Sequence, residues 1–231
     1  MKKAVQHLKK NLNSIFPSHN RKAYVILGII FFGMFSSFTF IVRSDVLRSF
    51  DFNTTVRLQD DIPLRFDEFF SFLSVTGRFE LSMIILVVIL LLRRKILGVM
   101  TIGLFGFAHV IEIIGKGILS QPGPPHMFLR TTDLSVQFPG LYVHTDASYP
   151  SGHSLRVVFL SIMIILIIYR SKKMHVSLRF TAIGIVATYA ILMLISRVSL
   201  GEHWTTDVIG GALLGAAFGF FSLLLIDNYS K

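Results

Sequence analysis

The stretch Ala23–Val42, AYVILGIIFFGMFSSFTFIV, runs for 20 residues without a charged side chain. A helix needs about 20 consecutive apolar residues to cross the hydrocarbon core of a bilayer, so this stretch predicts a transmembrane helix. A long basic region precedes it and no small-residue cleavage site follows, which favours a retained span over a signal peptide. The chain is therefore predicted to be a membrane protein.

Further apolar runs predict five more spans. They are Leu81–Leu92, which can begin earlier through the apolar Phe69–Val75, then Ile96–Gly115, Ser154–Tyr169, Leu178–Ile195 and Val208–Ile226. The segment Arg43–Glu80 mixes charged and aromatic residues and is predicted to lie outside the membrane, with a short interfacial helix around Leu64–Leu73. The predicted fold class is all-α: a polytopic membrane protein with six transmembrane helices in a bundle and an extramembrane segment between helices 1 and 2. Residues 1–22 form a basic tail, and residues 23–231 form one domain.

Composition agrees with a membrane environment. Of the 231 residues 52% are hydrophobic and 16% are charged, whereas about a quarter of the residues are charged in soluble domains. The absence of cysteine excludes disulfides, thiolate metal sites and cysteine nucleophiles. The formal net charge is +10, but the basic residues are not interleaved with aromatic residues on one soluble face. We therefore expect membrane lipids and not nucleic acid as partners. Nothing in the sequence indicates an oligomeric state.

The positions of the basic residues predict the orientation. With six spans, the N-terminal tail (Lys2, Lys3, Lys9, Lys10, Arg21, Lys22), the turn Arg93–Lys95 and the turn Arg170–Lys173 fall on one side. Short basic loops mark the cytoplasmic side. The loop Lys116–Pro150 and the junction Arg197–Asp207 then lie together on the opposite side. We expect a multi-pass protein of a bacterial cytoplasmic membrane, with a cytoplasmic N-terminus and a site on the extracytoplasmic face.

One polar cluster lies at the start of the fourth span, Tyr149-Pro150-Ser151-Gly152-His153. Proline and serine are common at helix starts, so a capped helix with an incidental histidine is one interpretation. The other is an anion site, because a helix N-terminus offers N–H groups and a positive dipole, and Gly152 lets a phosphate approach the backbone. His153 would then stand beside the anion, where it can donate a proton.

A second cluster combines Arg197 with His203 and Asp207. A helix would place His203 and Asp207 one turn apart on one face, where the carboxylate can fix the imidazole tautomer and leave the other ring nitrogen as a nucleophile. Arg197 offers a fork of donors for phosphate oxygens. The plain alternative is that His203 and Asp207 only cap the last helix.

A third cluster contains Lys116, with Glu112 one helical turn before it and Gly123-Pro124-Pro125 after it. A lysine at a membrane boundary is often a snorkelling side chain. Two imidazoles, an arginine, a lysine and a helix N-terminus on one membrane face are, however, the set that a phosphoryl group requires.

These blocks resemble the type 2 phosphatidic acid phosphatase superfamily, which shares its core with vanadium haloperoxidases. The resemblance rests on Pro150-Ser151-Gly152-His153 and on Ser196-Arg197-x5-His203-x3-Asp207. It implies a metal-independent phosphatase without a cofactor. His203 would be the nucleophile, Asp207 would orient it, and His153 would protonate the leaving oxygen. The implied phosphate cradle consists of Lys116, Arg197 and the backbone of Ser151 and Gly152.

One block departs from the family pattern, which has lysine, six residues, then Arg-Pro. Counting from Lys116, the arginine position holds Gly123. A substitute could be Arg156, three residues beyond His153 on the same helix, or Arg130 in the loop; we favour Arg156. Other interpretations are a differently charged or smaller substrate group, or weak or lost activity.

The resemblance implies a lipid phosphatase with a phosphohistidine intermediate. Its substrate would be phosphatidic acid, phosphatidylglycerophosphate or a polyprenyl diphosphate, between which the sequence does not distinguish. A phosphotransferase would use the same site. A non-catalytic membrane binding or transport protein on the same scaffold is an alternative of another class, supported by Gly123. Six spans and access from the bilayer fit a haloperoxidase less well.

Overall fold

The computed structural model describes residues 21–93, 96–119, 121–130, 147–171 and 173–226, and these ranges contain helices and no strand. Six helices correspond to the six predicted spans: α2 (Arg21–Arg43), α5 (Phe79–Arg93), α6 (Met100–Leu119), α7 (Gly152–Arg170), α8 (Val176–Ser199) and α9 (Thr205–Ile226). The predicted all-α membrane fold is therefore confirmed. Several basic residues that predicted the orientation lie outside the described residues, namely Lys2, Lys3, Lys9, Lys10, Arg94, Lys95 and Lys172.

Five of these helices are long and apolar enough to cross a membrane. The sixth crossing needs a broken pair, in which Leu64–Thr76 and Phe79–Leu92 meet at an angle of 55°. The first half of this pair is the 3-10 turn η1 (Leu64–Phe66) followed by α4 (Asp67–Thr76). The short helix predicted around Leu64–Leu73 is thus present, slightly displaced, and it leads directly into α5.

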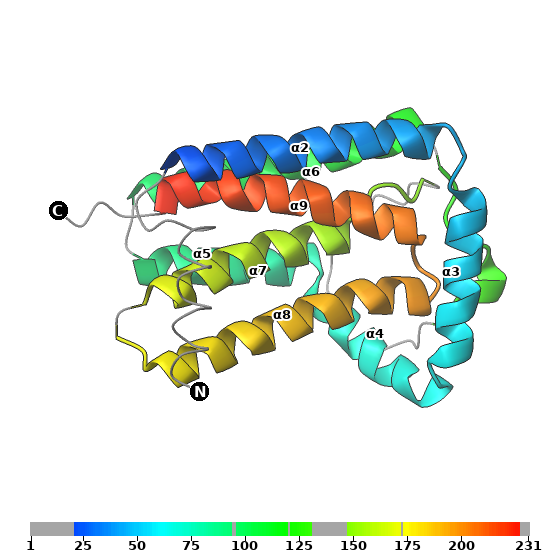
Figure 1. The fold of residues 1–231 in the computed structure, drawn as a ribbon. Coiled ribbons are helices and arrows are strands. Elements are labelled where there is room, and N and C mark those ends of the chain that lie inside the picture. Colours follow the sequence, from blue (N-terminus) through cyan, green and yellow to red (C-terminus); the bar gives the residue numbers. More distant parts are fainter. Residues whose placement is uncertain (1–20, 94–95, 120, 131–146, 172, 227–231) are drawn as a thin grey trace, which may run out of the picture.

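The segment after the first span contains a helix that the sequence did not predict. This helix, α3 (Arg48–Asp61), has the sequence RSFDFNTTVRLQDD, in which no apolar stripe repeats at helical spacing. It crosses one end of the bundle, as Figure 1 shows. Tertiary contacts hold it there, because the carboxylate of Asp51 accepts hydrogen bonds from the backbone N–H and the hydroxyl of Thr206.

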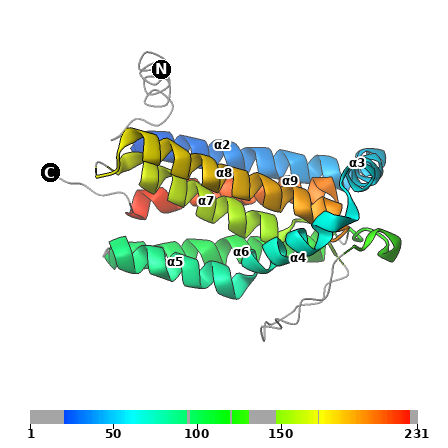
Figure 2. The same ribbon diagram turned by 90° about the horizontal axis from the view of Figure 1, so that it is seen from below.

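The long helices run side by side, with α9 between α2 and α7 (Figures 1 and 2). Close approach of α9 to α7 depends on glycine. A Cβ added to Gly211 would lie 2.2 Å from the carbonyl oxygen of Ser151, and one added to Gly215 would lie 2.3 Å from that of Leu155. Small residues at four-residue spacing let two helix backbones touch, which fixes the register of α9 against α7.

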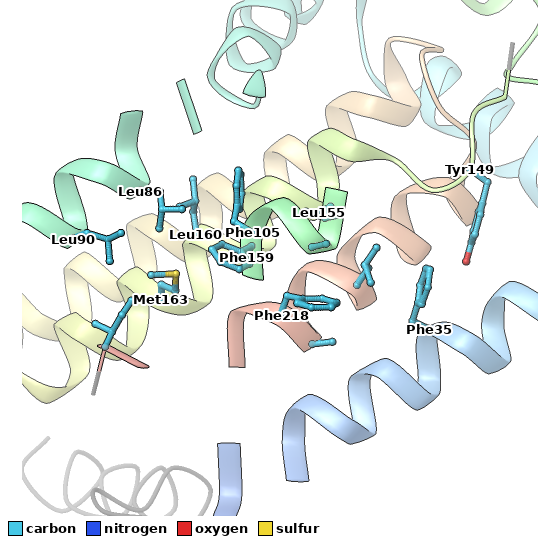
Figure 3. Packing of buried hydrophobic residues seen from close by; sticks show 14 of the residues in the cluster. Phe35, Leu86, Leu90, Phe105, Tyr149, Leu155, Phe159, Leu160, Met163 and Phe218 are labelled. Atoms are coloured by element: carbon cyan, nitrogen blue, oxygen red, sulfur yellow. The ribbon is translucent and has the colours of Figure 1, made fainter. Parts of the chain in front are cut away.

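Aromatic and aliphatic side chains fill the space between the helices, and Figure 3 shows part of this core. Phe105 of α6 packs edge-on against Phe159 of α7, with ring centroids 5.1 Å apart. Phe35 of α2 stacks on Tyr149, which lies just before α7. The core therefore ties α7 to both α2 and α6 and holds the start of α7 in a fixed position.

Candidate active site

The predicted site residues gather at one end of the bundle, on the right in Figure 1. There α6 and α8 end, while α7 and α9 begin. Lys116 at the end of α6, Arg156 in α7, Arg197 at the end of α8 and His203 in the turn before α9 all lie near the His153 ring, so side chains from four parts of the chain converge on it. The convergence that the sequence predicted is thus present in the fold.

His203 and Asp207 are joined through a residue that the sequence analysis missed. The hydroxyl of Ser148 lies 3.0 Å from Nδ1 of His203 and donates to Oδ2 of Asp207 at 2.5 Å. The direct distance from Nδ1 to Oδ2 is 3.5 Å. With Nδ1–H donating to Ser148, the proton is fixed on Nδ1, and none of the described residues hydrogen-bonds the other ring nitrogen, Nε2.

The route by which His203 and Asp207 meet differs from the prediction. The prediction that one helix contains both residues is wrong, because α9 begins at Thr205 and His203 lies in the turn before it. Oδ2 of Asp207 accepts from the backbone N–H of Trp204 at 2.8 Å, as a carboxylate in the first turn of a helix commonly does. The capping interpretation is therefore correct for Asp207, and this cap is what brings its carboxylate beside His203.

Ser151 is the N-cap of α7, as predicted, and its hydroxyl accepts from the N–H of Ser154 at 3.4 Å. Its own backbone N–H donates to the carbonyl oxygen of Asp207 at 2.9 Å. The starts of α7 and α9 are therefore tied together. Beside them, a Cβ added to Gly152 would lie 2.3 Å from Oε1 of Glu112, so only glycine leaves room for that carboxylate.

Lys116 has the partner that its spacing predicted. Its Nζ donates to Oε1 of Glu112 at 2.9 Å. Oε2 of Glu112 lies 3.9 Å from the guanidinium of Arg156. One buried carboxylate therefore bridges a cation of α6 and a cation of α7.

Arg156 also contacts the His153 ring. One guanidinium nitrogen lies 3.4 Å from Nδ1 of His153, and Nε donates to the carbonyl oxygen of Gly77 at 2.7 Å. These contacts fix the ring and leave Nε2 of His153 as the nitrogen that can face a substrate. The carbonyl of Gly77 is available at this point because the chain breaks between α4 and α5.

Arg197 is fully buried in the last turn of α8, where its guanidinium forms a bidentate ion pair with Glu202. Its carbonyl oxygen accepts from the N–H groups of Glu202 and His203, both at 3.1 Å. The residue thus supplies a cation to the site and anchors the backbone of the turn that carries His203.

The two proposed substitutes for the missing arginine have different positions. Arg130 pairs with Asp67 through two contacts, at 2.9 and 3.0 Å, and donates to the carbonyls of Gln59 and Ile62. It fastens the loop to α3 and α4, so its charge is committed away from the phosphate cradle. Gly123 itself lies beside Ser148, to which an added Cβ would be 3.6 Å distant.

A cavity of about 710 Å³ borders the site without including the predicted site residues. Its lining includes Gly123, Trp204, Thr206 and Asp51, together with residues at the end of α2. The indole N–H of Trp204 donates to the carbonyl oxygen of Pro122 at 2.9 Å. The cavity therefore lies next to the turn that carries His203, where it can hold a part of a ligand that does not react.

Two groups outside the membrane-spanning helices have shifted pKa values. Burial raises the pKa of Tyr149 to about 12, so its hydroxyl stays protonated and shares a hydrogen bond of 2.8 Å with Thr39. Burial also raises the pKa of Asp51. Within the described residues, no group of three or more His, Cys, Asp or Glu side chains is arranged to hold a metal ion.

Ser148 and Asp51 make contacts at the candidate site that sequence reasoning missed. Ser148 stands two residues before Pro150 in a polar loop, and no spacing rule links it to His203. Asp51 is more than 150 positions from Thr206 in the sequence, and its helix has no periodic signal. In both cases the contact exists only because distant segments fold against each other.

Comparison with known proteins agrees with the predicted resemblance. The model of the PAP2 superfamily matches residues 81–231. An undecaprenyl-diphosphatase from Sulfolobus acidocaldarius is 33% identical over 153 residues, and the match covers 66% of this chain. The chain also spans 66% of the length of that relative.

Two solved structures share the fold. A transmembrane PAP2-type phosphatidylglycerolphosphate phosphatase from Bacillus subtilis has a TM-score of 0.65 and 20% identity, over 85% of this chain and 94% of its own. LpxE from Aquifex aeolicus has a TM-score of 0.55 and 22% identity, over 75% of this chain and 94% of its own. At these identities the likeness concerns the arrangement of the membrane helices.

Proposed function

The chain belongs to the PAP2 superfamily, the type 2 phosphatidic acid phosphatases and their relatives, and on this premise we propose that it is a metal-independent membrane lipid phosphatase that works through a phosphohistidine intermediate. The observation that carries the proposal is the chain of contacts from Nδ1 of His203 through Ser148 to Asp207, which engages one of the two ring nitrogens of His203. Such a chain fixes one ring nitrogen and leaves the other as a nucleophile.

In the first step, Nε2 of His203 attacks the phosphorus atom of the lipid phosphate. The P–N bond forms as the bond from phosphorus to the leaving oxygen breaks, and His153, which is protonated when the phosphate dianion is bound beside it, gives its proton to that oxygen. The positive charge that develops on the His203 ring is stabilised by the Asp207 carboxylate through Ser148. The products of this step are a phosphohistidine and the rest of the lipid, which is the lipid alcohol when the substrate is a monoester and the lipid monophosphate when it is a diphosphate.

In the second step, water attacks the phosphohistidine. His153, now neutral, takes a proton from the water as the P–O bond forms and the P–N bond breaks. Inorganic phosphate leaves, and both histidines return to their starting states. The reaction therefore needs only groups that this chain supplies.

The cradle for the phosphate oxygens would consist of Lys116, Arg197 and the first turn of α7 from Gly152 onwards. The backbone N–H of Ser151, which the resemblance also assigned to the cradle, already donates to the carbonyl oxygen of Asp207. A helix N-terminus and fixed cations stabilise the extra negative charge of the transition state without reorganisation. We propose that Arg156 takes the place of the arginine missing at Gly123, because it lies against His153 and is linked to Lys116 through Glu112.

The substrate is proposed to be a lipid with a phosphate monoester or diphosphate at its head. The relative from Sulfolobus acidocaldarius is an undecaprenyl-diphosphatase, which favours a polyprenyl diphosphate over phosphatidic acid or phosphatidylglycerophosphate. The basic residues before the first span favour an extracytoplasmic site. A lipid whose chain stays in the bilayer could present its phosphate at this end of the bundle.

The test is release of inorganic phosphate from a panel of these lipid phosphates by purified protein in detergent. We expect His203→Ala to lower turnover by about 10³-fold or more, since the nucleophile is lost. His126→Ala is the matched control, because His126 is an exposed histidine, and it should retain wild-type turnover. Equal phosphate release by His203→Ala and wild type would refute the proposal. Transfer of the phosphoryl group to a lipid alcohol, without phosphate release, would instead identify a phosphotransferase.

A further inference from the structure

The three cations proposed for the cradle are each paired with a carboxylate of the protein. Lys116 and Arg156 share Glu112, and Arg197 pairs with Glu202. Three positive charges therefore face two negative charges before any ligand arrives. A phosphate group that uses these cations has to compete with carboxylates that already hold them.

The Glu112 carboxylate lies beside the start of α7, next to two of the cations proposed for the cradle. Its side chain is buried, and its Oε1 lies so close to Gly152 that even a methyl group there would collide with it, at 2.3 Å. Gly152 begins α7, so the carboxylate stands at the positive end of the helix dipole. An anion from the protein itself thus occupies the helix start, beside the same lysine and arginine that a phosphate would use.

The Glu112 carboxylate also has an alternative partner on α6. Its Oε2 lies 3.6 Å from Nδ1 of His109, one turn earlier on α6. Both ring nitrogens of His109 are buried, and neither has a hydrogen-bond partner among the described residues. Such an unpaired buried polar group is costly, so a hydrogen bond from Nδ1–H of His109 to the carboxylate would be favourable.

We propose that Glu112 fills the anion position of the cradle in the substrate-free protein and that the phosphate group of the substrate displaces it. The phosphate takes over Lys116 and Arg156, while the carboxylate turns from Gly152 towards His109. No covalent step is involved, because one anion is exchanged for another on the same cations. The inference rests on the proposed function, since it assigns the cradle to a phosphate group.

Replacement of the carboxylate by a ligand determines which ligands bind well. A ligand with a single negative charge gains little by replacing a carboxylate, because it brings the same charge. A tetrahedral oxyanion with two negative charges gains more from the same two cations. Glu112 is therefore a specificity-determining residue that selects for a doubly charged phosphate group and keeps the buried cations paired when the site holds no ligand.

The experiment is a calorimetric titration of the purified protein in detergent with inorganic phosphate. Glu112→Gln removes the competing charge and keeps the shape of the side chain, so the dissociation constant for phosphate should fall at least about tenfold relative to wild type. The matched control is Glu68→Gln, which removes the same charge from an exposed position on α4. It should leave the constant within about twofold of wild type, because exposed charges are screened by salt.

An unchanged or larger dissociation constant in Glu112→Gln would overturn the exchange. A larger constant is also what a purely structural role predicts, because loss of the carboxylate would then misplace Lys116 and Arg156. This result is distinguishable from failure of the proposed function. If wild type hydrolyses the lipid panel and Glu112→Gln does not bind phosphate more tightly, only the exchange is wrong. If wild type releases no phosphate from any lipid, the proposed function is wrong whatever the titration gives.

A second measurement keeps the inference testable if Glu112→Gln does not fold. A structure of the wild-type protein with orthovanadate bound should show the oxyanion on Lys116 and the Glu112 carboxylate moved away from Gly152. An oxyanion bound with the Lys116–Glu112 contact still near its present 2.9 Å would overturn the exchange.

Discussion

Helices α8 and α9 both contribute to the site, but they are held in the protein in different ways. In α9, 67% of the most apolar stretch is buried inside the protein, whereas in α8 the share is 6%. The buried residues of α8 lie near its end, at Met193 and from Ser196 to Ser199. Those of α9 follow its whole length.

The difference shows two ways to position a functional side chain in a membrane protein. Asp207 is placed by the packing of an entire helix, because the glycines of α9 fix its register on α7. Arg197 is placed mainly by contacts near the end of α8, where Gln59 donates to the carbonyl of Ser199 and the backbone N–H of Arg130 donates to the carbonyl of Leu200. One side of the body of α8 is exposed, for example at Gly184 and Ile185, so substitutions on that side should be tolerated.

The largest effect is expected when one glycine in each helix is replaced by alanine. A Cβ at Gly215 of α9 would lie 2.3 Å from a backbone oxygen of α7, while a Cβ at Gly184 of α8 meets nothing within 4 Å. We expect Gly215→Ala to lower the free energy of unfolding by about 2–3 kcal/mol, since neither backbone can move aside cheaply. Gly184→Ala should change it by less than about 1 kcal/mol. Equal unfolding midpoints for the two variants in detergent would break the contrast.

The next effect concerns the start of α9. Ser148→Ala removes the hydroxyl between His203 and Asp207, and we expect kcat for phosphate release to fall by about tenfold to a hundredfold, because the proposed nucleophile loses its link to the carboxylate. The thermal unfolding midpoint should change little. Ser148→Thr keeps the hydroxyl and should retain most of the activity. If both variants lose activity equally, the loss comes from packing and not from the hydrogen bonds.

A smaller effect is expected at the end of α8. Gln59→Ala removes two hydrogen bonds, at 2.7 Å to Phe128 and at 2.9 Å to Ser199. The cost in stability should be about 1–2 kcal/mol. Because Arg197 then loses part of its anchor, we also expect kcat to fall several-fold. The neighbouring exposed Asp60, changed to Asn, is the control, and a Gln59→Ala variant with unaltered kcat would show that α8 needs no such anchor.

The smallest effect concerns pH and the contact of α3 with α9. Burial raises the folded-state pKa of Asp51 above its unfolded value, so folding favours the protonated form. Lowering the pH through the window between these two values should therefore stabilise wild type relative to Asp51→Asn, by less than about 1 kcal/mol. Unfolding midpoints of both proteins from pH 7 to pH 4 measure this difference. A difference in unfolding midpoint that stays constant from pH 7 to pH 4 would show that the Asp51 carboxyl titrates alike in the folded and unfolded states.

The long apolar runs and the motif blocks could be predicted because each is local. A helix in lipid has to satisfy its own backbone hydrogen bonds, so an apolar run of sufficient length is enough to identify a span. The cap at Ser151 and the pair of Lys116 with Glu112 follow from spacing along one helix in the same way. The site residues were predicted because they combine in type and spacing, and the fold brings them to one end of the bundle.

The contacts between distant segments of the chain could not be predicted from the sequence. Helix α3 has no periodic apolar face, so nothing in its own residues distinguishes it from a loop. The link of Ser148 to His203 and the commitment of Arg130 to Asp67 depend on how loops cross the end of the bundle. The bend between α4 and α5, which places the carbonyl of Gly77 beside Arg156, could not be predicted either, because Gly77 and the charged Arg78 between two apolar runs fit a loop as well as a bent pair of helices.

By itself, the sequence determined that the chain folds as a helical bundle in a membrane and which residues form the candidate site at one end, because hydropathy and helix spacing act over a few turns. Only the tertiary structure decided how that site is charged. It placed the Glu112 carboxylate against Gly152 and the Ser148 hydroxyl between His203 and Asp207. Electrostatic interactions depend on distances between residues far apart in the chain, and those distances exist only once the helices have packed.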